Sequence, residues 1–312
     1  MDRRHKVFFE SGGLRCAAWH YRGDNAACIV MAAGLGVPKE PGTNLLAQRF
    51  HRAGFSVLAF DYRRLGESAG NQRGLVRLGE QIADFEAAVD FAHTLPEVDP
   101  RKVAIWGFSV SGGHIYKVAA CMPDLGAAIV HAGLADGLAA TRHALKYVTP
   151  TVFLRMSLLA GADAVVTRLG RDPILIPLNA PKGQVASINT PDAQNGPDAL
   201  SPNGLYDDVW PKTVAASSAM RIAFYRPGRE APRIQVPLLV LEFQNDGVTP
   251  PGPAADAAAR APRGELAQLP GGHYAAMTDQ TDAAVDVVVG FLTRHVLDPT
   301  PLPEREPIAR GG

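Results

Sequence analysis

The stretch that decides the fold is Lys102-Val103-Ala104-Ile105-Trp106-Gly107-Phe108-Ser109-Val110-Ser111-Gly112-Gly113. Residues 102–108 form a largely apolar run, which is typical of a strand in a buried parallel sheet, and a helix can follow Ser109. A strand that stops at a serine before a helix lifts the hydroxyl above the sheet edge. The pattern predicts that Ser109 is a nucleophile; a capping serine at an ordinary turn is the alternative.

Further strands and helices alternate on both sides of this stretch. Apolar runs that suit buried strands cover residues 28–33, 56–61, 127–131 and 236–243. Helical periodicity appears in residues 44–53, 78–94 and 281–296. A hairpin is predicted where residues 6–10 and 14–21 flank Ser11-Gly12-Gly13. The alternation predicts an α/β fold with a mostly parallel, doubly wound sheet.

The segment 137–229 interrupts this alternation of strands and helices. It contains a helical stretch, residues 152–169, followed by a proline-rich stretch. A structureless insertion this long is unusual in a compact domain, so we expect an inserted helical lid over 137–229. The α/β core then covers 1–136 and 230–298, and 299–312 form a flexible tail. Apolar lid residues either line a pocket or simply pack the lid helix: Phe153, Leu154, Met156, Leu158 and Leu159.

A serine nucleophile needs a base, and the base needs a carboxylate to orient it. Asp246 follows the apolar run 236–243, and His273 lies in a glycine-containing loop before the last helix. Parallel strands place site residues at their carboxyl ends, so Asp246 is the expected acid and His273 the expected base. Asp246 alternatively forms a turn before Gly247, in which case Asp136 is the rival acid. His131 is a weak rival base, and His114 reads as structural.

Two backbone N–H groups are expected to bind a developing oxyanion. One belongs to Val110, directly after the nucleophile. The other is assigned to Leu35, because Ala33-Gly34-Leu35-Gly36 follows the apolar run 28–33 and brings the backbone close. The alternative is that these glycines only make a turn.

The literal Gly-x-Ser-x-Gly match, Gly66-Glu67-Ser68-Ala69-Gly70, lies elsewhere. The strand before Ser68 ends seven residues earlier, at Asp61, and the residues after it have no apolar helical face. Ser68 therefore lacks the strand-to-helix context of a nucleophile, and we expect it to be structural.

Together these motifs resemble the α/β-hydrolase superfamily over nearly the whole chain, and 137–229 is the least specific part. The order Ser109, Asp246, His273 matches, and residues 61–68 resemble the Asp-x-Arg-Gly-x-Gly-x-Ser segment of that family. More narrowly, the chain resembles bacterial proteins near the acetylxylan-esterase and dienelactone-hydrolase-like groups. Two residues depart from the pattern: Ala33 replaces a histidine found in many members, and Ser111 replaces the second elbow glycine.

The amino-acid composition limits the classes of partner that the protein is expected to bind. The 312 residues carry 31 basic and 31 acidic side chains, and this zero net charge argues against nucleic acid. The three cysteines have no metal-ligand spacing, and they suit a reduced compartment. The most apolar run, residues 26–35, is too short to span a bilayer. We expect a cytoplasmic protein with no membrane partner and no metal.

The sequence predicts a cofactor-independent serine hydrolase that cleaves a carboxylic ester, lactone or thioester through an acyl-enzyme on Ser109. Its partner is a small-molecule acyl substrate. The alternatives are a C–C bond hydrolase, an acyltransferase or a lactone-forming enzyme of secondary metabolism with the same side chains; a non-catalytic binding module is less supported, because no member of the set is missing. The oligomeric state is left open, with a homodimer among the options.

Overall fold

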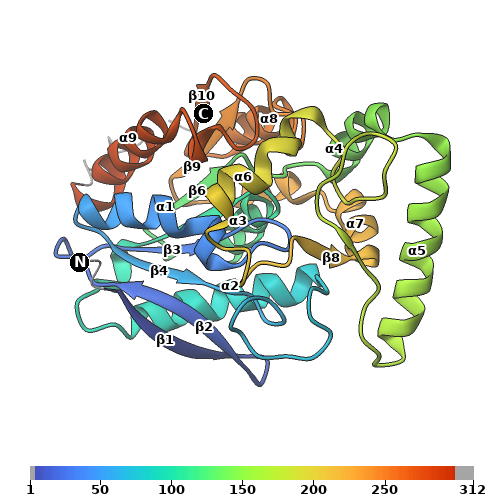
Figure 1. Ribbon diagram of the computed structural model, residues 1–312. Coiled ribbons are helices and arrows are strands. Elements are labelled where there is room, and N and C mark those ends of the chain that lie inside the picture. The colour runs from blue at the N-terminus through green and yellow to red at the C-terminus, as the bar shows by residue number, and fades with distance from the viewer. Residues whose placement is uncertain (1–3, 299–312) are drawn as a thin grey trace, which may run out of the picture.

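A twisted sheet of eight strands runs through the molecule in the order β1-β2-β4-β3-β5-β6-β9-β10 (Figure 1). The structure is a computed structural model and describes residues 4–298. β1 and β2 form an antiparallel hairpin, β2 pairs antiparallel with β4, and the remaining pairs are parallel. The strands of this sheet are β1 (Arg4–Ser11), β2 (Leu14–Tyr21), β3 (Cys28–Ala32), β4 (Ser56–Phe60), β5 (Val103–Phe108), β6 (Ala127–His131), β9 (Leu238–Phe243) and β10 (Gly264–Leu269).

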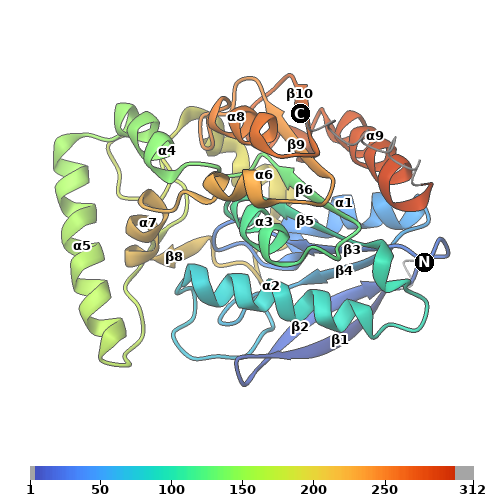
Figure 2. The ribbon, with the colours of Figure 1, turned by 180° about the vertical axis from the view of Figure 1, so that it is seen from behind.

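Helices cover both faces of the sheet. On one face lie α1 (Lys39–Arg52) and α9 (Thr281–Leu292), and on the other lie α2 (Leu78–His93), α3 (Val110–Cys121) and α8 (Pro253–Arg260) (Figure 2). Side chains alternate between the faces, so β5 contributes Trp106 to one apolar layer and Ile105 to the other. This arrangement confirms the predicted doubly wound α/β fold.

Two local predictions need correction, and one strand was missed. The helix expected over 44–53 begins at Lys39, because Pro41 lies in the first turn, where a proline costs no helical hydrogen bond. The helix expected over 281–296 ends at Leu292 and continues as a π-helical turn, Thr293–Leu297. β10 was not predicted, because this edge strand alternates between exposed and half-buried residues and has no continuous apolar run.

The segment 137–229 forms a layer of its own beside the carboxyl ends of the strands (Figure 1). It contains α4 (Gly137–Ala144), α5 (Pro150–Arg168), α6 (Gly196–Leu200) and α7 (Ala216–Ala223), and β7 (Leu175–Pro177) pairs with β8 (Thr213–Ala215). The lid boundaries stay a prediction, and the predicted tail lies outside the described residues.

α5 packs one narrow buried stripe, which includes Val152, Ala160 and Asp163, on α7. Within residues 4–298 it is also the one helix long and apolar enough to cross a membrane, by length and composition only. The sequence predicted a lid helix over 152–169, and Arg155 and Asp163 interrupt its apolar residues. Leu154 and Leu158 are exposed on its outer side.

Candidate active site

The turn between β5 and α3 holds Ser109 in a strained backbone conformation, with φ 58° and ψ −119°. L-residues rarely adopt a positive φ, and such strain at a strand-to-helix turn aims the side chain out of the sheet. A Cβ on Gly107 would lie 2.3 Å from the carbonyl oxygen of Ser111, so only glycine fits there. The predicted tight turn is present at Ser109.

Ser111 shows why serine can replace glycine in this turn. Its Oγ donates a hydrogen bond to the carbonyl oxygen of Ala33 and lies 2.7 Å from the hydroxyl of Tyr62. The side chain is almost fully buried, so both polar groups are satisfied away from water. Ser111 thereby fastens the turn to the loop that carries Leu35.

Ser109, His273 and Asp246 lie in one chain of hydrogen bonds. His273 Nδ1 is 2.7 Å from Asp246 Oδ2, and His273 Nε2 is 3.0 Å from Ser109 Oγ. Because the carboxylate only accepts, Nδ1 carries the proton, and Nε2 is free to accept from the serine hydroxyl. All three side chains are buried, with at most 6% exposure. The structure thus brings together the three residues singled out from the sequence; their catalytic roles stay predictions.

The loop after β9 orients the Asp246 carboxylate. Its Oδ1 accepts hydrogen bonds from the N–H groups of Val248 at 2.9 Å and Thr249 at 2.7 Å. Thr249 Oγ1 lies 2.8 Å from Asp246 Oδ2, 3.3 Å from His273 Nδ1 and 2.9 Å from the carbonyl oxygen of Ala132. Sequence reasoning missed Thr249, although a threonine three residues after a turn aspartate is a signal of such a loop.

The rival residues have other partners. Asp136 caps α4 through the N–H groups of Leu138 and Ala139 and pairs with Arg226. Burial opposes the charge of Asp136, but the Ala139 N–H and the Arg226 guanidinium outweigh it and lower the pKa of that carboxyl.

His131, the rival base, and His114, which was expected to be structural, are both fully buried. His114 bridges Gln81 and Tyr225, while His131 accepts from Trp106 Nε1. Burial lowers the pKa of each to about 3, and for His131 repulsion from His273 adds to this effect. Both imidazoles are therefore neutral at physiological pH.

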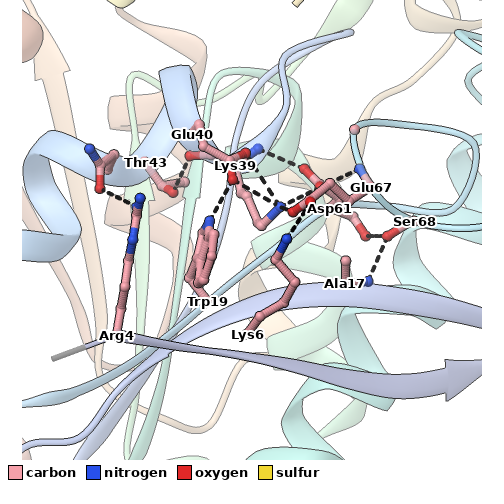
Figure 3. A network of polar contacts seen from close by, with 12 residues as sticks. Arg4, Lys6, Ala17, Trp19, Lys39, Glu40, Thr43, Asp61, Glu67 and Ser68 are labelled. Atoms are coloured by element: carbon pink, nitrogen blue, oxygen red, sulfur yellow. Dashed lines mark hydrogen bonds and ion pairs between the residues drawn. The ribbon is translucent and has the colours of Figure 1, made fainter. Parts of the chain in front are cut away.

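The second serine, Ser68, belongs to a network of polar contacts that joins β2, the loop after β4 and the start of α1 (Figure 3). Its Oγ donates to the carbonyl oxygen of Asp61 at 2.6 Å and accepts from the N–H of Ala17 at 2.8 Å. The Asp61 carboxylate in turn accepts from the backbone N–H and the ammonium of Lys39, at 2.7 and 2.8 Å. Lys39 begins α1 just after the Leu35 loop and also pairs with Glu67, which pairs with Lys6 of β1. The network therefore anchors that loop to β1, β2 and β4.

A cavity of about 110 Å³ opens beside Ser109 and is lined by both Leu35 and Val110. Val110 is the first residue of α3, where backbone N–H groups have no partner within the helix. The structure places both residues predicted to hold an oxyanion next to the serine, and their role in doing so stays a prediction.

A second cavity, of about 170 Å³, lies between α4, α5 and α7. The two cavities share Thr141, Ala144, Ser187 and Ala219, so they adjoin. Of the apolar lid residues named from the sequence, Phe153 and Met156 line the second cavity, whereas Leu154 and Leu158 face solvent. Among residues 4–298 no group of three or more His, Cys, Asp or Glu side chains is placed to hold a metal ion.

The comparisons agree with this geometry. Residues 22–287 match the alpha/beta hydrolase family. The chain belongs to the α/β-hydrolase family. This hydrolase is 34% identical over 294 residues, 93% of its length and 94% of the other chain, to the quorum-quenching protein AidA of Acinetobacter baumannii. A shorter match, 39% identical over 34% of this chain and 33% of the other, links it to the thiohydrolase aneE of Aspergillus aculeatus.

Solved structures show the same fold. The α/β hydrolase GrgF from Penicillium sp. sh18 superposes with a TM-score of 0.78 at 21% identity, over 94% of this chain and 99% of that one. The family match and the relative AidA confirm the superfamily expected from the sequence. The narrower likeness to acetylxylan esterases and dienelactone hydrolases stays a prediction.

Proposed function

We propose that this hydrolase cleaves a carboxylic ester, lactone or thioester through an acyl-enzyme on Ser109. The observation that carries the proposal is the hydrogen-bonded chain Ser109–His273–Asp246 at the edge of a cavity. A serine hydroxyl is a weak nucleophile until a base takes its proton, and this chain supplies the base and the group that orients it.

The mechanism follows from the positions of the atoms. His273 Nε2 takes the hydroxyl proton as Ser109 Oγ bonds to the acyl carbon, and Asp246 stabilises the imidazolium that forms. The N–H groups of Leu35 and Val110 bind the oxyanion. The imidazolium then gives its proton to the leaving alcohol or thiol as the acyl–oxygen or acyl–sulfur bond breaks, and water releases the acyl group by the same steps in reverse order.

The cavities favour an apolar acyl group. Beyond Ser109 the space continues under α5, where the wall is mostly Ala, Leu, Val, Ile, Met and Phe side chains. Against such a wall, each methylene of the acyl chain that leaves water strengthens binding by about 0.8 kcal/mol. Two relatives have names that are compatible with such a reaction, a quorum-quenching protein and a thiohydrolase, whereas others are named polyketide transferases, which fits the acyl-transfer alternative.

The test measures the covalent intermediate and its fate. Wild-type protein mixed with p-nitrophenyl esters and quenched in acid should gain the mass of one acyl group, and Ser109→Ala should gain none. Products are then analysed with and without an added alcohol or amine. Free acid in both cases supports hydrolysis, whereas capture of the acyl group by the added nucleophile replaces it with acyl transfer. Turnover by Ser109→Ala at the wild-type rate overturns the proposal.

The cavity assignment has its own test. Ala219 lines both cavities, so Ala219→Phe should narrow the passage between them. Esters with long acyl chains should lose at least about tenfold in kcat/KM, while acetyl esters keep theirs. Ala164→Phe adds the same ring on the exposed side of α5 and is the matched control. Equal losses for short and long esters would contradict the assignment.

A further inference from the structure

One carboxylate of the segment 137–229 reaches both loops that carry the acid and the base. Asp192 lies in the 3₁₀ turn Pro191–Asn195, before α6. Its Oδ2 accepts a hydrogen bond from the N–H of Gly247 at 2.9 Å and from the N–H of His273 at 3.3 Å. Gly247 follows Asp246 directly, so a single oxygen atom joins the two loops.

The chain leaves room for this carboxylate on both loops. A Cβ on Gly247 would lie 2.7 Å from Asp192 Oδ1, and a Cβ on Gly272 would lie 3.0 Å from Asp192 Cβ. The turn itself is held from the other side, because Asn179 Nδ2 donates to the carbonyl oxygen of Ala193 at 2.8 Å. The position of Asp192 is therefore set by its own segment and fits two glycines of the core.

A neutral side chain could accept the same two hydrogen bonds as the Asp192 carboxylate. Both N–H groups donate to Oδ2, whereas Oδ1 is buried and has no hydrogen-bond partner among the described residues. An asparagine would keep both bonds without burying part of a carboxylate, which is costly. A negative charge at this place is useful if a positive charge forms nearby, and the proposed mechanism forms one on His273.

Apart from the carboxyl groups of Asp246 and Asp192, the titratable side chains around His273 are neutral. Asp246 faces it from the β9 loop, His131 from β6, and Tyr274 from its own loop. Burial lowers the pKa of His131 to about 3, and burial raises the pKa of Tyr274, with Asp246 and Asp192 adding to that rise. Both groups are neutral over the range in which the enzyme would be assayed.

We propose that Asp192 is a positioning residue of the reaction: its carboxylate joins the acid loop to the base loop and supports the imidazolium that forms on His273. This role rests on the proposed function. It makes the segment 137–229 a part of the proton-transfer machinery as well as a wall of the cavity.

The experiment compares pH profiles of kcat and kcat/KM on a p-nitrophenyl ester. Asp192→Asn keeps both hydrogen bonds and removes the charge, so the acid limb should move to lower pH by about half a unit or more. On the plateau kcat should fall about three- to tenfold with little change in KM. Asp192→Ala also removes the bonds and should lose more. Asp198→Asn is the control, because it removes the same charge from an exposed position six residues away.

The results distinguish failure of the positioning role from failure of the proposed function. A profile of Asp192→Asn that superposes on the wild type, or that shifts no more than Asp198→Asn, overturns the positioning role. If Asp192→Ala does not fold, the asparagine variant still decides, provided its urea midpoint matches the wild type. Failure of the proposed function looks different: Ser109→Ala then turns over ester normally, whatever Asp192 does.

Discussion

Ser68 and Ser109 each follow a strand of the same sheet in a stretch that contains glycines and serines. Their hydroxyl groups have different kinds of hydrogen-bond partner. The backbone uses both the donor and the acceptor of Ser68, between Asp61 and Ala17. The hydroxyl of Ser109 instead meets a histidine and borders a cavity. The Gly-x-Ser-x-Gly match contains Ser68. The local backbone conformation is therefore a better guide to the reactive serine than the sequence motif alone.

The largest expected difference between the two serines is in activity. Ser109→Ala removes the attacking oxygen, and kcat/KM on p-nitrophenyl esters should fall by about 10⁴-fold or more. Ser68→Ala keeps every atom that faces the cavity, so its kcat/KM should stay within about threefold of the wild type. Loss of activity in a folded Ser68→Ala protein, with Ser109→Ala unaffected, would reverse the comparison.

Stability should rank the serines the other way. Ser68→Ala leaves the Ala17 N–H and the Asp61 carbonyl without their hydroxyl partner in a buried place, which should lower the free energy of unfolding by about 1–3 kcal/mol. Ser109→Ala should change it by less than about 0.5 kcal/mol. Urea denaturation of the two variants measures both, and equal losses would show that Ser109 also has a structural role.

The third prediction concerns Ser111, which has a hydroxyl used like that of Ser68 but lies in the turn of Ser109. Ser111→Ala cuts the link from this turn to Ala33, and kcat should fall about tenfold with KM nearly constant, because the oxyanion donors lose their spacing. Tyr62→Phe removes the neighbouring hydroxyl but keeps the Ala33 bond, and it is the control. An unchanged kcat for Ser111→Ala would show that the two loops are held by other contacts.

The last prediction concerns a difference in charge between the two regions, and at any one pH near neutrality it is the smallest of the effects. Ser68 lies among ion pairs, whereas His131, near Ser109, is kept neutral with its pKa lowered to about 3. Below the unfolded value of about 6.5 the unfolded chain binds a proton that the folded chain does not. The free energy of unfolding should therefore fall as pH drops from about 6.5 to 3, by up to about 1.4 kcal/mol per pH unit for this group.

Replacing the imidazole tests this linkage. His131→Asn retains an acceptor for Trp106 and does not titrate, so urea unfolding between pH 6.5 and 4 should show a shallower pH dependence than the wild type. His114, whose pKa burial also lowers to about 3, keeps its share in both proteins. A slope identical to the wild type would mean that His131 does not contribute.

Local patterns predicted the parts of the fold that local forces decide. The apolar run before Ser109 and the helix after it gave the turn, and the places of Asp246 and His273 after apolar or glycine-rich stretches gave two further residues of the site. β10 and the start of α1 were missed because an alternating edge strand and a proline in a first turn carry weak signals.

Contacts between distant segments could not be predicted in this way. Thr249 near Ala132, Ser111 near Ala33 and Asp192 near His273 are joined only after the chain folds back on itself. Asp192 also lies in a proline-rich stretch with no periodicity, so nothing in the sequence indicates which core loop it meets. Side-chain pairing across such separations depends on the packed backbone.

The central claim is that the serine of the strained turn is the nucleophile and the serine of the Gly-x-Ser-x-Gly match is not. Treatment with a fluorophosphonate, followed by digestion and mass spectrometry of the labelled peptide, tests it directly. We predict one adduct per chain, on Ser109, with loss of ester turnover in proportion to labelling. An adduct on Ser68, or full turnover by protein labelled at Ser109, would contradict the account.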